Sequence, residues 1–492
     1  MVASQLREFM GVFRLRSMQL LALACLLAGL AGLGIGAGTS IQDPDIWWHI
    51  KVGDWIVQNH SVPHVGIFSR TAGSQPWVAY SWACEVLQSR AYAWFGLVGF
   101  ALYGVLLTLA VAWTLFWMAQ RLSGRFWVSW ALCGIGSLGF LFTLMPRPVF
   151  FSMILFMVEL TLILEAQRSS RIRSLYWLPV LFVLWANLHI QFIYGLLVLG
   201  LFVGVNLLFK IARALGFSND SVVVPALPLQ PLFAVFAACA LAACVGPYTY
   251  HLYEVVLKYS QSKAAYGLIQ ELLAPDYKSF TDYVMVLLTA GSFFAIGARK
   301  RLDLFKLSLL LVATVLAFRT ARDGWFVGVC AVAILADHDE RQAPNEGIKL
   351  AEFAGLSAIV AALLFLIASN LGFSGRDLDR TISRTYPVDA ANFLRRNPAP
   401  GPLYNSLDWG GFLIWYMPQY PVSIDGRNDL YGDAFDVVAF KSLQGDYADD
   451  PYLNEAGVVL LPKSTPLATM LSVDAKLEVI YQDQLAVVLV RK

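Results

Sequence analysis

The chain has 492 residues, of which 58% are hydrophobic and only 14% are charged, and its mean hydropathy is +0.60. Soluble proteins are usually about 45–50% apolar and about 25% charged, so this composition excludes an ordinary soluble protein. The formal net charge is only +2 and no basic tract occurs, which argues against a nucleic-acid partner.

Eleven apolar segments approach the ~20 residues that a helix needs to cross a bilayer. They predict a mainly α fold with a polytopic membrane domain over residues 1–372. Arginine and lysine cluster after every second segment. This pattern predicts a protein of the inner membrane whose N-terminus and basic turns face the cytoplasm. The predicted spans lie near residues 18–38, 95–119, 126–145, 149–166, 175–190, 192–210, 230–246, 282–298, 305–320, 324–337 and 350–372.

Residues 373–492 have a different texture, because charged and turn residues alternate there with short apolar runs. The segments "PLYNS", "PVSID", "GVVLLP", "KLEVIY" and "LAVVLVR" have the pattern of strands, and "VDAANFLRR" and "AFDVVAFKSL" have the pattern of helices. Together they predict a small C-terminal α/β domain. With eleven spans before it, this domain is expected on the periplasmic side of the membrane.

The first predicted outer loop, residues 39–94, carries the motif Asp43-Pro44-Asp45 directly after the first span. Proline biases the preceding residue to an extended conformation, so the two carboxylates can approach one point. Such a pair can hold Mg²⁺ or Mn²⁺, or one carboxylate can take a proton from an attacking hydroxyl. His49 follows Asp45 by four residues, which puts both on one face of a helix over "DIWWHIKVGDWIV". Alternatively, the aspartates only cap this helix.

Further charged and polar side chains lie in the other turns on the same predicted face. Charges near a bilayer are unfavourable unless they are paired or hydrated, so this concentration indicates a functional site. Guanidinium groups suit a lipid phosphate, although they could also anchor helix ends. Trp47 and Trp48 are candidates for stacking on a sugar, or are anchors at the membrane interface. The candidate substrate-binding residues in the turns are Arg147, His189, Glu271, Arg319 and Arg322.

These features resemble the GT-C class of membrane glycosyltransferases, in which one or two acidic residues follow the first helix. The resemblance extends to "SQPWVAYSWACEVL", "MPRPVFFS", "WANLHIQFIYGL", "IQELLAPDY" and "NSLDWGGFLIWYMPQYPVSIDGRNDLYG", which match a broad group of bacterial membrane proteins placed with that class. It implies a sugar donor linked to polyprenyl phosphate and transfer at the outer face of the membrane. It also implies that Asp43 and Asp45 are the essential acids.

The sequence therefore predicts a membrane glycosyltransferase in which Asp45, with Asp43 and His49, activates the acceptor. Asp43 and Asp45 are also the candidate ligands of a divalent cation. The predicted partners are a polyprenyl-phosphate sugar, membrane lipids and, through the C-terminal domain, other proteins of a membrane complex. Two alternatives remain open: a non-catalytic scaffold subunit, and a transporter, which would place ionisable groups near the bilayer midplane.

Overall fold

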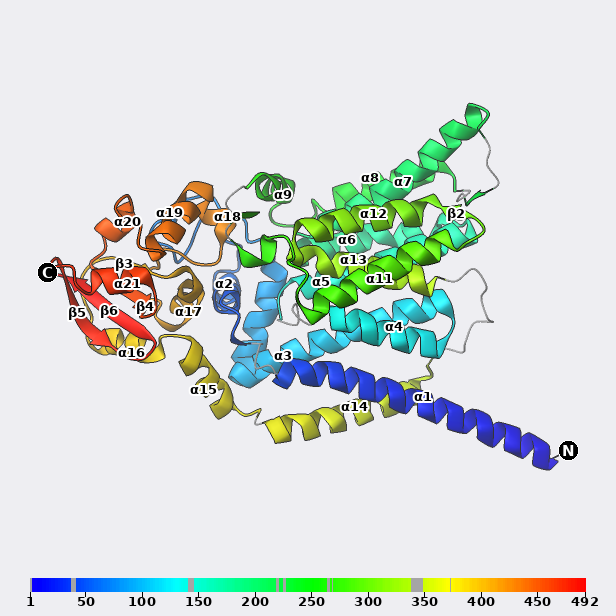
Figure 1. Ribbon diagram of the computed structural model, residues 1–492, viewed down its shortest axis with the longest axis horizontal. Helices are drawn as coiled ribbons and strands as arrows, with labels where there is room; N and C mark the ends of the chain where they lie inside the picture. The colour runs from blue at the N-terminus through cyan, green and yellow to red at the C-terminus, as the bar shows by residue number, and fades with distance from the viewer. Residues whose placement is uncertain are drawn as a thin grey trace.

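A bundle of roughly parallel helices forms one end of the molecule, and the C-terminal residues form a compact unit at the other end (Figure 1). The computed structural model describes residues 2–36, 41–139, 146–217, 221–223, 227–262, 266–267, 269–337, 348–371 and 373–492. The predicted mainly α, polytopic architecture is confirmed. The helices of the bundle run along the long axis of the molecule, and the N-terminus lies at the end of the bundle far from the C-terminal unit.

Each of the eleven predicted spans coincides with a helix. Within the described residues, six of these helices are long and apolar enough to cross a membrane by themselves. The six are α1 (Val2–Gly36), α3 (Trp82–Ser123), α5 (Val149–Ser169), α7 (Phe192–Ala214), α11 (Phe280–Gly297) and α14 (Leu350–Leu371). The shorter helices are α4 (Phe126–Gly139), α6 (Leu178–Leu188), α8 (Leu229–Ala242), α12 (Leu304–Arg319) and α13 (Gly324–Ala336).

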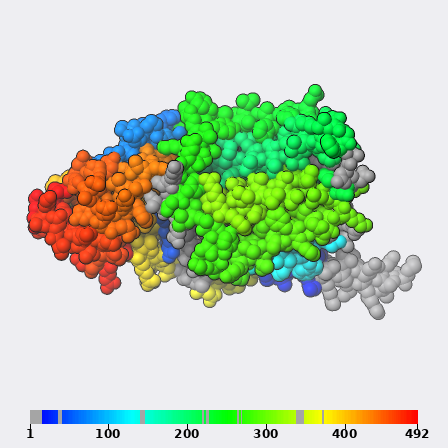
Figure 2. All heavy atoms as spheres, turned by 45° about the horizontal axis from the view of Figure 1, so that its top comes forward, coloured from blue at the N-terminus to red at the C-terminus, as the bar shows by residue number. Residues whose placement is uncertain are grey.

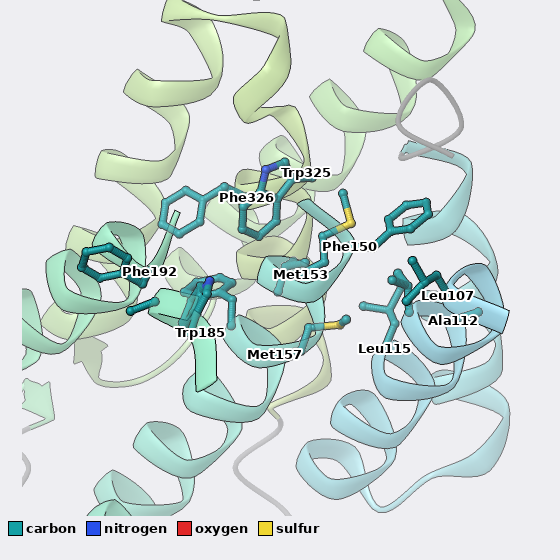
Figure 3. Packing of buried hydrophobic residues seen from close by; sticks show 14 of the residues in the cluster. Leu107, Ala112, Leu115, Phe150, Met153, Met157, Trp185, Phe192, Trp325 and Phe326 are labelled. Atoms are coloured by element: carbon teal, nitrogen blue, oxygen red, sulfur yellow. The ribbon is translucent and has the colours of Figure 1, made fainter. Parts of the chain in front are cut away.

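The interior of the bundle is filled by large apolar side chains from several helices (Figure 3). Met153 and Met157 of α5 lie at its centre, between Trp185 on one side and Leu115 of α3 on the other. Phe326 of α13 packs on Phe156 of α5 with ring centroids 4.8 Å apart. Because every residue of α13 except Gly324 and Leu335 is buried, that short helix is a central element of the bundle rather than a lipid-facing one.

The first outer loop contains the helix predicted over "DIWWHIKVGDWIV" and a further helical stretch before residue 95 that the sequence did not predict. It forms α2 (Asp45–Asn59), and α3 begins at Trp82 rather than near residue 95. A kink at Phe95 and Gly96, where Gly96 has φ +60°, separates the outer part of α3 from its apolar part. Trp94 is 71% exposed beside this kink, a position suited to the membrane interface.

The predicted C-terminal α/β domain contains a four-stranded sheet in the order β3-β4-β6-β5. β3 (Leu403–Asn405) pairs in parallel with β4 (Val458–Pro462), whereas β6 (Ala486–Arg491) is antiparallel to both β4 and β5 (Leu477–Gln482). Its helices are α15 (Gly375–Thr385), α16 (Val388–Arg396), α17 (Leu407–Tyr416), α18 (Asn428–Tyr431), α19 (Asp433–Leu443), α20 (Pro451–Asn454) and α21 (Pro466–Leu471). The predicted boundary at residue 372 and the first residues of the loop 39–94 lie outside the described residues.

The prediction of a strand at "PVSID" is wrong, and the reason lies in its partner. Instead of joining the sheet, this segment pairs with the first outer loop: Arg70 N donates to Val422 O at 2.8 Å, and Val422 N donates to Phe68 O at 3.1 Å. A strand within a sheet and a short isolated bridge can have the same alternating sequence pattern, so the sequence alone does not distinguish them. The C-terminal domain is thereby fixed to the loop that carries Asp43 and Asp45.

The remaining short elements connect the helices at the two ends of the bundle. They are η3 (Ile172–Trp177), the two-residue strands β1 (Val222–Val223) and β2 (Leu302–Asp303), α9 (His251–Gln261), η4 (Gln270–Leu272) and η5 (Ala321–Asp323). Figure 1 places α2 and α9 at the end of the bundle that meets the C-terminal domain, and β2 at the opposite end.

The close packing of α2 on α3 gives a prediction for stability. A Cβ atom added at Gly53 would overlap the carbonyl oxygen of Glu85, so Gly53→Ala should lower the free energy of unfolding by about 1–3 kcal/mol. The measurement is the thermal midpoint in detergent. Gly355→Ala in α14 is the matched control, because a Cβ atom added there would have no neighbouring atom within 4 Å. Equal midpoints for both variants would contradict the close approach.

Candidate active site

The motif Asp43-Pro44-Asp45 forms the entry to α2. Pro44 has φ −62° and precedes the helix, and the Asp43 Oδ1 atom accepts a hydrogen bond from Asp45 N at 3.1 Å. Asp43 therefore does satisfy one amide at the start of the helix, as the capping alternative predicted. Its main partner, however, is a residue from a distant part of the chain.

Asp43 is fully buried and forms a two-pronged ion pair with Arg147. Arg147 Nε donates to Asp43 Oδ2 at 2.5 Å, and Arg147 Nη2 donates to Asp43 Oδ1 at 2.9 Å. Arg147 lies between Pro146 and Pro148, just before α5, and Pro148 is the N-cap residue of that helix. Burial alone would raise the pKa of Asp43, but the charge and hydrogen bonds of Arg147 hold that pKa below its usual value.

Glu271 extends this ion pair into a chain of alternating charges. Arg147 Nη1 donates to Glu271 Oε2 at 2.7 Å, and Arg322 Nη2 donates to Glu271 Oε1. The short elements η4 and η5, which carry Glu271 and Arg322, are joined by the hydrogen bond from Ala321 N to Leu273 O at 2.9 Å. Burial opposes ionisation of Glu271, but the two guanidinium groups outweigh it and lower the pKa of Glu271.

This chain of charges is only partly buried. The side chains of Arg147, Glu271 and Arg322 keep 23%, 35% and 38% of their surface exposed, respectively. A bound anion could therefore contact Arg322 without first unfolding a helix. Of the acids and arginines predicted to converge from distant turns, the structure brings together Asp43, Arg147, Glu271 and Arg322.

Asp45 lies beside the same chain but in a different environment. Its Oδ1 atom accepts a hydrogen bond from Trp48 Nε1 at 3.1 Å, while its Oδ2 atom lies 3.9 Å from Arg147 Nη2. Gly426 of the C-terminal domain packs against the carboxylate so closely that a Cβ atom at Gly426 would overlap Asp45 Oδ1. Burial, and then the negative charge of Asp43, raise the pKa of Asp45 to about 6.

The two aspartates of the motif thus have different protonation behaviour. Asp43 is a permanent anion bound to Arg147, whereas Asp45 can bind and release a proton near neutral pH. Neighbouring acids with separated pKa values are a common sign of divided roles in an active site. The geometry therefore assigns ion pairing to Asp43 and leaves Asp45 Oδ2 as the oxygen available for proton transfer.

The two predicted histidines lie next to this cluster and are held by other groups. His49 is buried, and its Nδ1 atom lies 3.2 Å from Glu85 Oε1. His189 bonds through Nδ1 to Ser152 Oγ at 2.8 Å. Burial and then the positive charge of Arg322 lower the pKa of His189 to about 3, so this histidine is neutral at physiological pH.

Three residues that the sequence predicts to contact the substrate or its phosphate make other contacts in the structure. Trp47 is fully buried against Tyr386, Phe412 and Trp415, so it cannot stack on a sugar. Trp48 is 5% exposed and orients Asp45 instead. Arg319 lies over the Tyr266 ring at 4.3 Å. The tryptophans are therefore not membrane anchors either, because α2 packs against α17 rather than against lipid.

The predicted metal site does not fit the donor atoms that the structure places there. Both oxygens of Asp43 already accept hydrogen bonds from Arg147, and one oxygen of Asp45 accepts from Trp48. Within the described part of the chain, no group of three or more His, Cys, Asp or Glu residues is arranged to hold a metal ion. A guanidinium group takes the place that a cation would need between the two carboxylates.

Sequence reasoning did not identify Gly426, Tyr80 or Tyr259 as parts of this site. Tyr80 and Tyr259 pack with ring centroids 6.4 Å apart. Burial and then the Asp429 carboxylate raise the pKa of Tyr80. The positive charge of Arg322 lowers this pKa, and the negative charge of Asp45 raises it. Glycine and tyrosine are too common in turns for their positions alone to indicate such a role.

Comparison with known proteins gives a partial likeness. Two solved structures of ArnT from Cupriavidus metallidurans, one bound to undecaprenyl phosphate and one in the apo state, are similar to this chain. Each is 14% identical in sequence, and each match covers 94% of this chain and 97% of the ArnT chain, with TM-scores of 0.47 and 0.44. No family model and no curated protein matches the sequence.

The burial of Asp43 gives a prediction for Arg147. Arg147→Met leaves a buried carboxylate without its partner, which should lower the free energy of unfolding by about 3–5 kcal/mol. Arg319→Met is the matched control, because its stacking on Tyr266 is worth only about 0.5–1 kcal/mol. The double variant Asp43→Asn/Arg147→Met should be more stable than Arg147→Met alone. Thermal unfolding in detergent measures all three, and equal losses for Arg147→Met and Arg319→Met would contradict the pairing.

Proposed function

We propose that this protein is a membrane glycosyltransferase that transfers a sugar from a polyprenyl-phosphate donor to a hydroxyl acceptor at the periplasmic face. The observation that carries the proposal is the pairing of a proton-binding carboxylate, Asp45, with an open cluster of guanidinium groups, at the end of the bundle that holds the C-terminal domain. The reaction needs a base close to an anion site, and Arg147, 3.9 Å from Asp45 Oδ2, links Asp45 through Glu271 to Arg322. The resemblance of the Asp43-Pro44-Asp45 motif to that of GT-C enzymes points in the same direction.

In the proposed reaction, the acceptor oxygen attacks the anomeric carbon of the donor sugar. A new C–O bond forms as the bond between that carbon and the phosphate oxygen breaks, and the electron pair leaves with polyprenyl phosphate. The acceptor proton passes to Asp45 Oδ2. Attack opposite to the leaving group inverts the anomeric centre.

Arg322 is the residue best suited to bind the phosphate. It keeps 38% of its side chain exposed, and Glu271 holds its guanidinium group in place. Arg147 contributes positive charge, but its donors are engaged by Asp43 and Glu271, so its main role is to position Asp43. A guanidinium group stabilises the negative charge that develops on a departing phosphate.

The prenyl chain of the donor fits the membrane environment of the bundle. The outer surfaces of α7, α11 and α14 carry exposed apolar side chains, including Phe294 and Phe365. A long hydrocarbon chain can lie along such surfaces while its phosphate reaches the polar turns at one end. The reaction would therefore take place at the boundary between the bilayer and the C-terminal domain.

The proposal predicts a large loss of activity in Asp45→Asn. Removing a general base slows the reaction by about 10²–10⁴-fold, and the amide can still accept the hydrogen bond from Trp48. The assay is release of polyprenyl phosphate from a panel of polyprenyl-phosphate hexoses and pentoses with a saccharide acceptor. Asp276→Asn is the matched control, because that exposed acid lies in a nearby turn and pairs with Lys278.

The same assay has a pH signature. Asp45 acts as a base only when it is ionised, so the rate should fall as the pH decreases through about 6. Near-wild-type release by Asp45→Asn would remove Asp45 from the mechanism. If the wild-type protein turns over no member of the panel and purifies with a larger membrane complex, the scaffold alternative is favoured instead.

A further inference from the structure

A cavity with a mixed polar and apolar lining lies beside the first outer loop, and none of Asp43, Asp45, Arg147, Glu271 and Arg322 lines it. Its volume is about 370 Å³, within the range of small-molecule sites. The first outer loop, α9 and the C-terminal domain enclose it, and these three segments meet on the face shown in Figure 2. Its lining includes His64, Trp77, His251, Glu254, Lys258 and Asp429.

Two segments connect the lining of this cavity to Asp45. Trp77 in the cavity wall lies 6.2 Å, centroid to centroid, from Trp48, whose Nε1 atom donates to Asp45. Asp429, which also lines the cavity, follows Gly426, the residue packed against Asp45, by three positions. Arg427 between them is fully buried, paired with Asp425 and placed over the Trp77 ring at 4.8 Å, so it fixes both walls relative to Asp45.

The chemistry of the lining favours a neutral polyhydroxylated ligand. Lys258 Nζ donates to the Asp429 carbonyl oxygen at 2.5 Å, and His251 Nδ1 bonds to Glu254 Oε2 at 2.7 Å. The lining therefore contains both donors and acceptors. Two carboxylates in the lining are unfavourable for a phosphate, whereas sugar hydroxyls need both donors and acceptors.

The apolar part of the lining supports the same ligand class. Trp77, Val78 and Val255 form it, and the face of a sugar ring carries C–H groups that pack on such a surface. A wholly apolar ligand, such as a prenyl chain, would remove water from the charged groups of the lining without replacing its hydrogen bonds.

We propose that this cavity binds the saccharide portion of the acceptor and presents one of its hydroxyl groups to Asp45. The inference rests on the proposed function and deepens it, because it separates two subsites. The donor phosphate lies at Arg322, and the acceptor saccharide lies between Trp77, α9 and Asp429. Tyr80 and Tyr259 pack together, and charges from both subsites, Asp429 and Arg322, act on Tyr80.

The test uses binding rather than turnover, in full-length Asp45→Asn protein in detergent. Saturation-transfer NMR with a panel of neutral mono- and disaccharides should show contact, and the Kd should rise at least tenfold in the added variants Lys258→Met and Glu254→Ala. Glu478→Ala on β5 is the matched control, because that exposed glutamate lies outside the cavity. Unchanged melting temperatures show that the variants fold.

Each outcome decides the proposal. Binding of free saccharides, or binding only of lipid-linked saccharides, supports the cavity and identifies the source of the acceptor. No saccharide binding, or equal Kd values in the cavity variants and the control, overturns it. Saccharide binding that depends on Lys258, in a protein without transferase activity toward any donor, keeps the cavity as a saccharide site and refutes only the proposed transfer reaction.

Discussion

The buried ion pair between Asp43 and Arg147 is the interaction on which the site depends. A carboxylate with no exposed surface is stable as an anion only if a cation contacts it directly, and the two hydrogen bonds from Arg147 meet this need. Because this pairing fixes the guanidinium plane, the remaining nitrogen of Arg147 points to Glu271, and Glu271 in turn holds Arg322. One buried charge thus orders a chain that reaches from the first outer loop to η5.

The C-terminal domain completes the site rather than lying apart from the membrane helices. Val422 pairs with the first outer loop, Gly426 packs on Asp45, and α17 covers Trp47. Position 426 needs a glycine for a steric reason, because any larger residue would push the Asp45 carboxylate away from its position. The proposed base, anion site and acceptor cavity therefore come from three parts of the chain that only the folded protein brings together.

The sequence predicted the elements better than the contacts between them. Apolar runs of sufficient length located all eleven helices, and the alternation in "GVVLLP" and "LAVVLVR" located β4 and β6. The pairing of Asp43 with Arg147 spans 104 residues, and no local pattern encodes it. The sequence does not reveal that another domain buries Trp47, because an amphipathic helix has the same pattern whether lipid or another domain covers its apolar face. The role of Gly426 depends on a close approach that only the tertiary structure reveals.

The central claim is that this cluster of guanidinium groups binds a polyprenyl phosphate beside Asp45. The most direct measurement is an electron cryo-microscopy map of the full-length protein in lipid nanodiscs with added polyprenyl phosphate. The account predicts phosphate density in contact with the Arg322 guanidinium group, next to Glu271 and on the same side of the bilayer as Asp45. Phosphate density at the basic turns on the opposite end of the bundle, with none at Arg322, would contradict it.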